Sequence, residues 1–474
     1  MKVLFVSAEV TPFAKAGGLA DVALALPKAL HALGVDVRVV MPKYRRIAEA
    51  ASPTEACRFS VPIGGREVPC VAYEDTLPGG SVPIVFLEND AYYDRPEIYG
   101  EGGEYPDALE RFSFLSLGAL KLCEALSWWP DVIHGNDWHT SLLSGYLADR
   151  AVAGFDKAAS LLTIHNLGYQ GVFPVDQAEV TGLSDAALEP YRQGARINLL
   201  KGGILSFDRI NTVSPTYAKE ILEEGAGLEA ELNVRRADLS GVINGVDVDV
   251  WNPKTDEHLW ANYDAEDLSG KAVNKERLQA ELGLHIDAKA PLLGVISRLA
   301  EQKGFDLIMA AFDRMMDLGM QFTLLGTGAP EYEAYFREAQ ARYPGRVSAQ
   351  ITFSEAWAHR IEAASDAFLM PSHYEPGGLN QQYSLLYGTV PVVRATGGLA
   401  DTVHEYDRSG NTGNGFLFRD RTPEAFLDAV KRALAVYRED EAGWRGLIDR
   451  GMRQDLSWEG SARAYLDLYR EVAG

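Results

Sequence analysis

Short runs of valine, isoleucine and leucine recur along this chain of 474 residues, and longer stretches with helical spacing separate them. Strands that are apolar throughout, without polar alternation, are typical of a parallel sheet whose two faces are both covered. Alternation of such strands with helices predicts an α/β architecture of the doubly wound type. The runs that we expect to form strands are 3–9, 37–42, 82–89, 131–137, 161–166, 210–215, 292–298, 322–328, 366–372 and 390–398.

These strands fall into two groups, which predicts two domains. The chain is longer than the roughly 250–300 residues at which a single hydrophobic core stops growing. Its hydrophobic content of 47% is ordinary for a globular protein and allows large cores. Few strand signals follow the sequence VINGVDVDVWNP, so we place the hinge at 245–253. The predicted domains are therefore residues 1–245 and 246–456.

Charge and cysteine content limit the partners that this chain can have. The formal net charge of −22 opposes binding to a polyanion, so we expect no nucleic-acid partner and a small or neutral substrate. Cys57, Cys70 and Cys123 form no paired framework and no C-x-x-C motif, which suits a reducing compartment. The N-terminal apolar run is too short for a signal peptide, and no run approaches the roughly 18 residues of a membrane span. We expect a cytoplasmic protein without a membrane partner.

The pentapeptide G-G-L-A-D occurs twice, at 17–21 and at 397–401. Each copy follows a predicted strand and opens a predicted helix, where glycines let backbone N–H groups approach an anion or a sugar hydroxyl. The helix N-terminus adds partial positive charge. Two such loops from two sheets can face one cleft, although a tight turn without a ligand would also need glycine. Neither copy fits G-x-G-x-x-G, which disfavours a dinucleotide site.

Charged residues follow several predicted strands at the ends where doubly wound sheets bind ligands. Lys15 precedes the first glycine pair, and Arg298 and Lys303 follow a strand in the second half. Arg298 can hold a phosphate through two parallel hydrogen bonds and Lys303 as a point charge, or both can be solvated surface residues. Glu375 follows another strand, where it can bind sugar hydroxyls, stabilise positive charge at an anomeric carbon, or act only as a helix N-terminal acid.

Seven motifs in a fixed order give the chain a resemblance to a known family. They are KAGGLADV, HGNDWHT, TIHNLGYQG, VINGVDVDVWNP, SRLAEQKG, SHYEPGGLNQ and ATGGLADTV. Together they resemble the bacterial glycogen synthases and plant starch synthases, which are retaining glucosyltransferases of the GT-B fold with two Rossmann-like domains facing a central cleft. The resemblance implies transfer of α-glucosyl from ADP-glucose to the 4-hydroxyl at the non-reducing end of an α-1,4-glucan, with release of ADP. It also implies that the C-terminal helix, 457–474, packs back on the N-terminal, acceptor-side domain, and that 246–456 is the donor side.

Site residues follow from the same resemblance, position by position. In the N-terminal half it implies that Lys15 lies near the donor phosphates and glucose, with Gly17 and Gly18 beside it. The other N-terminal residues that it implies for the cleft and hinge are Asp21, Asp137, His165 and Asn244, with Tyr93 near the donor sugar. Tyr92, next to Tyr93, leaves this register open.

In the C-terminal half the resemblance implies that Arg298 and Lys303 stabilise the leaving diphosphate and that Phe353 stacks on the adenine. Glu375 matches the glutamate of E-P-x-G-L. The loop residues assigned to substrate binding are Gly377, Gly378, Leu379 and Asn380. We assign catalysis to Glu375, Lys303, Arg298, His165 and Asp137.

Four positions depart from the family or its relatives, and the first is Ala16, which replaces a threonine or valine. Gly377 stands where the family commonly has a cysteine. Asn380 stands where it has a threonine, and asparagine and threonine can both form hydrogen bonds. Sucrose and trehalose-type transferases usually carry a second glutamate eight positions after the first, and here that position is Tyr383. This difference favours the glucan synthases.

The mechanism follows from the charges that develop when the C1–O bond breaks. Cations and glycine-loop N–H groups would stabilise the diphosphate. A covalent intermediate needs a second carboxylate beneath C1, and the motif around Glu375 contains none. We therefore favour attack on the same face, in which a phosphate oxygen accepts the proton of the acceptor. Closure about 245–253 would exclude water.

Other polar and aromatic clusters have simpler interpretations. Asp247 and Asp249 form D-x-D in the hinge, and His134 and His139 lack zinc-site spacing, so we predict neither a metal nor a cofactor. We expect Trp128 and Trp129 to pack against other side chains. We expect His359 and His373 to have structural roles. Alternative functions are a retaining GT-B enzyme that uses UDP-glucose or another acceptor, a nicotinamide-dependent oxidoreductase, and a non-catalytic glucan-binding protein. The sequence makes no prediction of the oligomeric state.

Overall fold

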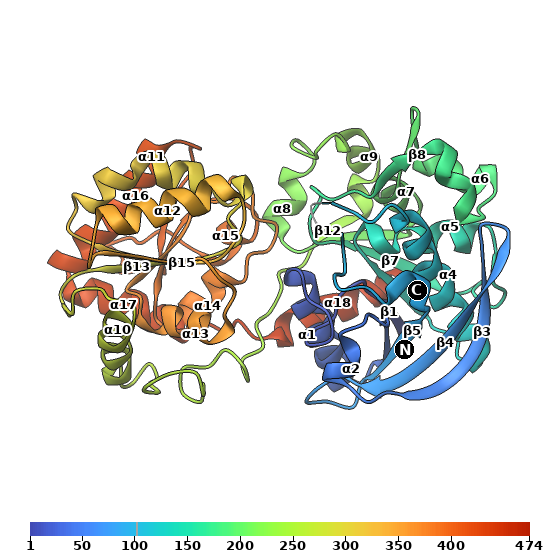
Figure 1. Ribbon diagram of the computed structural model, residues 1–474, viewed down its shortest axis with the longest axis horizontal. Coiled ribbons are helices and arrows are strands. Elements are labelled where there is room, and N and C mark those ends of the chain that lie inside the picture. The colour runs from blue at the N-terminus through green and yellow to red at the C-terminus, as the bar shows by residue number, and fades with distance from the viewer. Residues whose placement is uncertain (101–102) are drawn as a thin grey trace. The chain divides into compact units, whose positions relative to one another are not determined.

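All ten apolar runs form strands in the structure, a computed structural model that describes residues 1–100 and 103–474. The described chain divides into two units, which are named here by their residues. Unit 1 comprises Met1–Asn244 and Trp458–Gly474, and unit 2 comprises Gly245–Ser457. In each unit a mostly parallel sheet carries helices on both faces (Figure 1). The expected α/β, doubly wound fold class is confirmed.

Unit 1 is built on a nine-stranded sheet in the order β12-β11-β7-β6-β1-β2-β5-β4-β3. Neighbouring strands from β12 to β5 are parallel, and the β4–β5 and β3–β4 pairs are antiparallel. The strands are β1 (Lys2–Val6), β2 (Asp36–Pro42), β3 (Thr54–Ile63), β4 (Arg66–Thr76), β5 (Pro83–Glu88), β6 (Val132–Asn136), β7 (Ala159–Ile164), β11 (Arg209–Thr212) and β12 (Leu239–Gly241). A separate three-stranded sheet contains β8 (Val172–Pro174), β9 (Arg192–Gln193) and β10 (Arg196–Asn198).

The β3–β4 hairpin was not among the expected strands. Its strands alternate between exposed and buried residues, whereas the expected strands are apolar runs without polar alternation. The turn joins Ile63 to Arg66 through Gly64 and Gly65, whose φ angles are 57° and 71°. Two consecutive residues with positive φ form the tight hairpin turn that matches strand twist. The Gly-Gly pair between alternating segments is the signal that predicts this hairpin.

Helices cover both faces of the unit 1 sheet, with α1 and α18 on one face and α4, α5 and α7 on the other (Figure 1). The helices are α1 (Gly18–Ala32), α2 (Ile47–Ala50), α3 (Asp90–Tyr93), α4 (Ala108–Leu126), α5 (Leu142–Ala148), α6 (Asp185–Leu188), α7 (Leu199–Ser206), α8 (Pro215–Glu220), α9 (Glu229–Val234) and α18 (Trp458–Ala473). The C-terminal α18 buries Trp458, Ala462, Tyr465 and Tyr469 along one face in the core of unit 1. The spacing of these residues places them on one side of a helix.

Unit 2 contains a fully parallel six-stranded sheet in the order β15-β14-β13-β16-β17-β18. Its strands are β13 (Leu292–Ile296), β14 (Gln321–Leu325), β15 (Val347–Gln350), β16 (Ala367–Met370), β17 (Val390–Arg394) and β18 (Phe416–Phe418). Its helices are α10 (Ser269–Glu281), α11 (Phe305–Met316), α12 (Pro330–Arg342), α13 (Glu355–Ala364), α14 (Asn380–Leu386), α15 (Gly397–Thr402), α16 (Pro423–Glu439) and α17 (Glu441–Met452). Helices α11, α12 and α16 cover one face, and α10, α13 and α14 cover the other (Figure 1).

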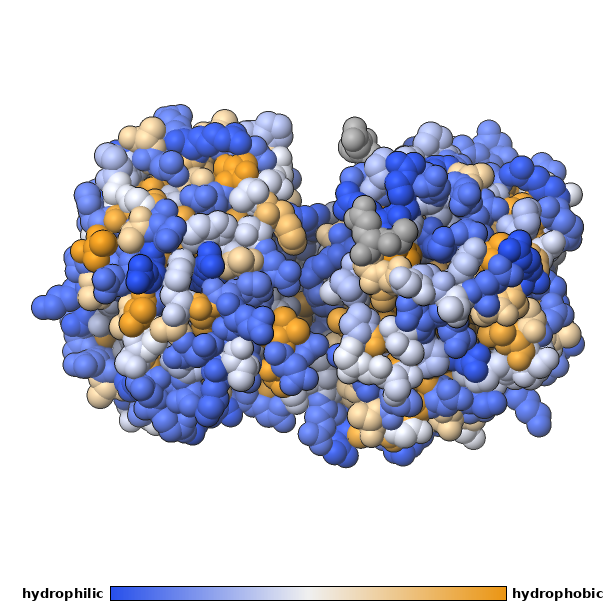
Figure 2. Space-filling model, turned by 60° about the horizontal axis from the view of Figure 1, so that its bottom comes forward, coloured by the Kyte–Doolittle hydropathy of each residue, from blue (hydrophilic) through white to orange (hydrophobic). Residues whose placement is uncertain are grey.

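On the surface, hydrophilic residues predominate over the face drawn in Figure 2, and hydrophobic residues form small separate areas. None of the helices in residues 1–100 and 103–474 is long and apolar enough to cross a membrane.

Candidate active site

In unit 2, Lys303 and Glu375 form an ion pair at the carboxyl ends of two neighbouring parallel strands. Lys303 ends the short 3-10 turn η5 (Glu301–Lys303) after β13, and Glu375 lies on the loop after β16. The Nζ of Lys303 donates to Oε1 of Glu375 at 2.9 Å and to Oε2 at 2.7 Å. The carboxylate is 7% exposed and the lysine side chain 20%. An incoming anion would therefore compete with Glu375 for the ammonium group.

Two further side chains hold the Glu375 loop. The Oγ of Ser372 donates to Oε2 of Glu375 at 2.9 Å. Arg394, at the end of β17, is buried and its Nε donates to the carbonyl oxygen of Ser372 at 2.7 Å. Its Nη2 donates to the carbonyl oxygen of His373. Because both acceptors are backbone carbonyls of the residues that lead into Glu375, Arg394 fixes the start of this loop.

The second G-G-L-A-D copy lies against the same loop. The backbone N–H of Gly398 donates to the carbonyl oxygens of Glu375, at 3.1 Å, and Pro376, at 3.0 Å. A Cβ on Gly397 would lie 2.0 Å from the oxygen of Glu375, and one on Gly398 would lie 1.7 Å from the oxygen of Gly377. Only glycine allows so close an approach. The expectation that the N–H groups of this loop face a ligand is therefore wrong for Gly398, which supports the loop of Glu375 instead.

The predicted substrate loop, Gly377 to Asn380, leads into α14. Gly378 has a φ of 64°, a left-handed conformation that favours glycine. The Nδ2 of Asn380 donates to the carbonyl oxygen of Ile296 at 2.6 Å, so this amide ties the loop to β13. Leu379 packs on a small cluster that contains Tyr383. The side chains of Leu379 and Asn380 thus shape the loop, while the carbonyl oxygens of its glycines accept from Gln381 and Gln382 at the start of α14.

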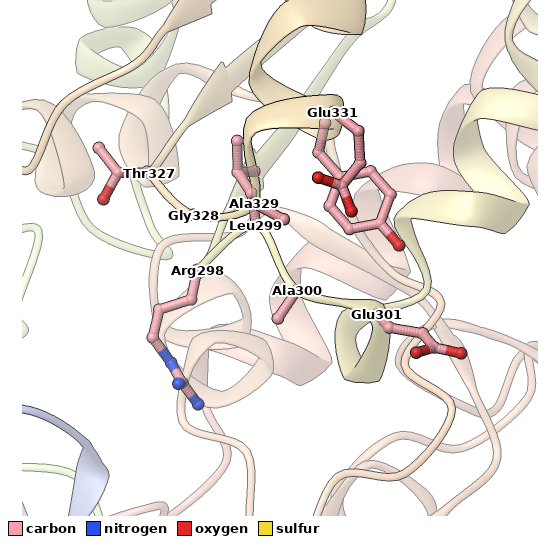
Figure 3. Close-up of a pocket in the computed structure, with 9 residues that line it drawn as sticks. Arg298, Leu299, Ala300, Glu301, Thr327, Gly328, Ala329 and Glu331 are labelled. Carbon is pink, nitrogen blue, oxygen red and sulfur yellow. The ribbon is translucent and has the colours of Figure 1, made fainter. Parts of the chain in front are cut away.

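Arg298 lines a pocket of about 600 Å³ beside this region. The pocket lies between the loop after β13 and the loop after β14, which are joined by hydrogen bonds from Leu299 N to Thr327 O (2.9 Å) and from Ala329 N to Leu299 O (2.8 Å). In Figure 3 the guanidinium of Arg298 and the carboxylate of Glu301 point in different directions from one loop. The cation and the carboxylate thus lie at different parts of the wall, and only the part near Arg298 favours a phosphate.

Two aromatic groups in unit 2 differ in exposure. Phe353 lies just before α13 and is 85% exposed, so a flat ring is available for stacking. Trp251, by contrast, is sandwiched between Tyr383, at 3.7 Å between ring centroids, and His359, at 3.8 Å. The Nδ1 of His359 is 2.7 Å from Oδ2 of Asp256. Tyr383, which replaces the second glutamate of related transferases, therefore packs against the segment that begins unit 2.

In unit 1, Lys15 and Asp21 form an ion pair at the start of α1. The Nζ of Lys15 donates to Oδ1 of Asp21 at 2.7 Å, and the Oγ1 of Thr11 donates to the same oxygen at 3.1 Å. The side chain of Lys15 is 45% exposed, so its ammonium remains accessible to solvent and to a ligand.

Glu9 occupies the backbone groups that were expected to face an anion. Its Oε2 accepts from the backbone N–H of Ala16 at 2.6 Å and of Gly17 at 2.9 Å, and its Oε1 accepts from the hydroxyl of Tyr99 at 2.6 Å. Glu9 is only 4% exposed. The prediction that the N–H groups of the first glycine loop bind a diphosphate is therefore wrong for Gly17, because an internal carboxylate already takes this place.

Asp137 and His165 are brought together at the ends of β6 and β7. The Oδ1 of Asp137 accepts from the backbone N–H of His165 at 2.7 Å, and Asp137 itself has a φ of 56°. Burial raises the pKa of Asp137 to about 7, so its carboxyl group changes charge near neutral pH. The Nε2 of His165 lies 2.9 Å from Oδ1 of Asn136, and burial lowers the pKa of His165 to about 3. Its imidazole is neutral at pH 7.

Tyr93 does not lie at a surface that could meet a donor sugar. It is fully buried, and its hydroxyl donates to the carbonyl oxygen of Arg111 at 2.7 Å. The implied contact is therefore corrected, because the ring fills the core between Tyr44 and Phe114. Asn244, the last residue of the first segment of unit 1, is also buried.

The remaining polar clusters have local partners. Oδ1 of Asp247 accepts from the backbone N–H of Asp249 at 3.1 Å, and His134 lies between Tyr469 and Thr163, at 2.7 Å from each hydroxyl. Within residues 1–100 and 103–474, no group of three or more His, Cys, Asp and Glu side chains is placed to hold a metal ion.

Trp128 is buried beneath Lys2 and Arg38, whereas Trp129 packs edge-on against Phe155 and is 36% exposed.

Sequence reasoning missed Glu9, Tyr99, Ser372 and Arg394. Ser372 is the first residue of the motif SHYEPGGLNQ, and Glu9 lies six residues before KAGGLADV, so position in or near a motif was the available signal. Arg394 lies in a predicted strand just before the second G-G-L-A-D motif, but nothing local shows that it reaches the carbonyl oxygens of Ser372 and His373. Tyr99 reaches Glu9 from 90 positions away, and no local pattern marks it.

Comparisons with known proteins agree with this arrangement. Residues 2–234 match the family described as starch synthase catalytic domain, and residues 280–442 match the family described as glycosyl transferases group 1. A glycogen synthase from Anaeromyxobacter sp. is 46% identical over 486 residues, covering 100% of both chains. A glycogen synthase from Thermotoga maritima is 45% identical over 487 residues, covering 100% of this chain and 99% of its own.

Comparison with solved structures also finds a starch synthase. The catalytic domain of starch synthase IV from Arabidopsis thaliana, a structure with ADP and acarbose bound, has a TM-score of 0.91 at 34% identity and covers 100% of this chain and 99% of its own. Sucrose-phosphate synthase from Thermosynechococcus elongatus, at 18% identity, a TM-score of 0.60 and coverage of 99% of this chain and 98% of its own, shares the fold alone. The GT-B fold class is confirmed. The chain therefore belongs to the family of glycogen and starch synthases, and it is a glycosyltransferase of glycogen synthesis.

Proposed function

We propose that the chain transfers α-glucosyl from ADP-glucose to the non-reducing-end 4-hydroxyl of an α-1,4-glucan with retention, and that it releases ADP. The observation that carries this proposal is the Lys303–Glu375 pair beside Arg298, at the carboxyl ends of parallel strands in unit 2. Arg298 and Lys303 supply two cations for a diphosphate, and Glu375 supplies one buried carboxylate for a sugar that becomes positively charged. The Arabidopsis starch synthase structure holds ADP, which supports an adenine nucleotide.

The proposed roles follow from charge. When the C1–O bond breaks, negative charge grows on the diphosphate, and Arg298 and Lys303 are placed to stabilise it. The diphosphate would draw Lys303 away from Glu375 and leave the carboxylate to face the sugar. Both partners are largely withdrawn from water, which strengthens these interactions. We favour attack from the same face, in which the leaving phosphate oxygen accepts the proton of the acceptor hydroxyl.

We assign the donor side to unit 2 and the acceptor side to unit 1, where Asp137 and His165 would bind glucan hydroxyls. Asp137 can donate or accept a hydrogen bond near pH 7 because burial raises its pKa to about 7. We also propose a cytoplasmic location, which the three free cysteines support.

The deciding experiment measures nucleoside diphosphate release from ADP-glucose and from UDP-glucose with glycogen as acceptor. We expect kcat/KM to be at least about tenfold higher for ADP-glucose. Equal or greater kcat/KM with UDP-glucose would contradict the donor assignment. NMR of the anomeric proton in the new linkage tests retention, since an α-linkage is expected and a β-linkage excludes it.

A control variant separates stacking from base selection. Phe353→Ala should weaken the binding of both ADP-glucose and UDP-glucose by a similar amount, about 1–3 kcal/mol, because stacking tolerates any base. A loss confined to ADP-glucose would instead give Phe353 a role in selecting the base.

A further inference from the structure

Glu9 is a buried carboxylate that the family motifs do not single out. It follows β1, and its backbone is fixed by Ser7, whose Oγ donates to the carbonyl oxygen of Glu9 at 2.6 Å. Both carboxylate oxygens have donors, namely the N–H groups of Ala16 and Gly17 on one and the hydroxyl of Tyr99 on the other. A carboxylate that is 4% exposed is costly unless such donors compensate for lost water. The side chain therefore holds the segment that carries Lys15 in one conformation.

Tyr99 extends this contact to a second functional loop. Its ring stacks on His139, with centroids 5.2 Å apart and planes 26° apart. His139 lies in the 3-10 turn η1 (Trp138–Thr140), directly after Asp137, and Phe112 packs against its ring at 4.7 Å. A continuous chain of contacts thus runs from the backbone beside Lys15 through Glu9, Tyr99 and His139 to the loop of Asp137.

This chain joins two segments that are far apart in sequence, and each contributes residues assigned to turnover. Lys15 and Asp21 belong to the first segment, and Asp137 to the second, where it binds the backbone of His165. The donors on Glu9 come from positions 16, 17 and 99, so no single local turn explains why an acidic residue is needed here. Without Glu9, two backbone N–H groups and a hydroxyl would lose their acceptor, and the segment of Lys15 would lose its connection to the loop of Asp137.

We propose that Glu9 is a positioning residue for glucosyl transfer, which acts with Tyr99 to hold the Lys15 segment and the Asp137 loop in register within unit 1. Glu9 does not itself meet the substrate in this role. The inference rests on the proposed function, because it takes Lys15 and Asp137 as parts of the transfer machinery.

The test compares Glu9→Ala, Glu9→Gln and Tyr99→Phe in the full chain. Glu9→Ala should lower kcat by about 10- to 100-fold through misplacement of Lys15, with KM for the donor changed much less. ADP affinity, measured by calorimetry, should fall much less than kcat, because the two cations proposed to hold the diphosphate, Arg298 and Lys303, lie in unit 2. Glu9→Gln should recover most of kcat, since its Oε1 can accept from both N–H groups while its amide donates to the oxygen of Tyr99. Tyr99→Phe keeps the ring on His139 and should have an intermediate effect.

Tyr146→Phe is the matched control. The Tyr146 hydroxyl is also buried in unit 1 and donates to the carbonyl oxygen of Thr181 at 2.8 Å, and neither residue belongs to the Lys15 segment or the Asp137 loop. It should show normal kcat even if the unfolding temperature falls as far as in Tyr99→Phe. If Tyr146→Phe and Tyr99→Phe lose turnover equally, the effect is general destabilisation and the proposal is overturned.

Two other results would also overturn the proposal. One is normal kcat in a folded Glu9→Ala protein. The other is equal loss in Glu9→Ala and Glu9→Gln at unchanged unfolding temperature, which would assign Glu9 a direct role through its charge. If Glu9→Ala does not fold, the comparison of Glu9→Gln with Tyr99→Phe decides. Failure of the proposed function is a separate result, since the unaltered chain would then transfer no glucose from ADP-glucose.

Discussion

The two G-G-L-A-D segments have identical letters, yet the structure uses them for different purposes. At 17–21 the glycines open the 15-residue helix α1, and nothing lies within 4 Å of the place where a Cβ of Gly17 would stand. At 397–401 they open the short α15, and added Cβ atoms on Gly397 and Gly398 would strike the backbone of the Glu375 loop. The second copy needs glycine for a close contact, whereas the space beside Gly17 in the first copy is open.

Each copy is also tied to a buried glutamate, and the two ties differ in kind. In unit 1 the carboxylate of Glu9 accepts from the N–H groups just before α1, so the hydrogen bonds of this side chain are made within the protein. In unit 2 it is the backbone of Glu375 that accepts from Gly398, so its carboxylate stays available to Lys303. A repeated motif therefore predicts a repeated loop but not a repeated role.

The largest expected effect concerns acid stability, because the two units bury different ionisable groups. In unit 1, burial lowers the pKa of His134, His139 and His165 to about 3. Unfolded histidine has a pKa near 6.5, so below this pH the unfolded state binds more protons and unfolding becomes easier as the pH falls towards 3. Each histidine contributes up to about 1.4 kcal/mol per pH unit. The pKa of Asp137 is raised to about 7, so its contribution to stability increases as the pH falls below 7 and offsets part of this loss.

In unit 2, burial raises the pKa of Glu362 to about 8, and its contribution to stability is fully present at low pH and is lost as the pH rises towards 8. Unit 1 should therefore unfold first on acidification from pH 7 to 4.5, as followed by proteolysis of the full chain and mapping of the cleaved peptides. His134→Gln should reduce the effect, and the exposed His31→Gln should not. Earlier cleavage in unit 2 would contradict this prediction.

The next largest effect separates Glu375 from its alternative as a helix-end acid. Glu375→Gln keeps the shape of the side chain and removes its charge, so kcat should fall by about 10²–10³, or roughly 2.7–4 kcal/mol. ADP affinity, measured by calorimetry, should not fall and should rise to the extent that ADP no longer competes with Glu375 for Lys303. Glu405→Gln, which alters an exposed ion pair with Arg432 in the same unit, is the control and should turn over normally. Near-normal turnover with a small loss of thermal stability would identify Glu375 as a structural acid only.

Gly398→Ala tests the close contact in unit 2. Its Cβ cannot be accommodated 1.7 Å from the oxygen of Gly377 without a backbone shift, so we expect a loss of about 1–3 kcal/mol in the free energy of unfolding, together with lower kcat. Gly460→Ala in α18, where nothing lies within 4 Å of the Cβ position, should be neutral or stabilising. Chemical denaturation measures both, and an unchanged midpoint for Gly398→Ala would refute the contact.

Gly17→Ala tests the open approach in unit 1. The backbone there is extended, with φ of −150°, so alanine fits and the free energy of unfolding should change by less than about 0.5 kcal/mol. Turnover should nevertheless fall, by about tenfold, if a substrate approaches this backbone. A loss of stability as large as that of Gly398→Ala would remove the distinction between the two copies.

Cysteine alkylation is expected to have no effect on the donor site, the smallest of these outcomes. Gly377 supplies no thiol to the Glu375 loop, and the three cysteines all lie in unit 1, where burial raises the pKa of Cys70 and raises that of Cys123 to about 12. Alkylation should cause no loss of activity that ADP-glucose prevents. Protection by the donor would show that a cysteine reaches the site.

Local pattern was enough for much of the fold and for part of the site. Strands such as β13 and β16 are apolar throughout, and that pattern alone marks a strand buried on both faces. Lys303 and Glu375 could be proposed because each follows such a strand, and parallel strands bring their carboxyl ends to one edge. Tyr93 could not be judged in this way, since its neighbours in sequence do not reveal whether its ring faces a ligand or the core.

The sequence by itself thus determined the two doubly wound sheets, the glycine loops at the helix starts and the family, because these depend on periodicity, turn chemistry and motif order. Only the tertiary structure decided which glycine stands beside open space and which makes a close contact, and which carboxylate is used inside the protein. Those outcomes depend on partners such as Tyr99, 90 positions from Glu9, and Arg394, 22 positions from Ser372. Distances of 2 to 3 Å between groups so far apart in the chain are set by the packing of whole strands and helices, which no local stretch of sequence records.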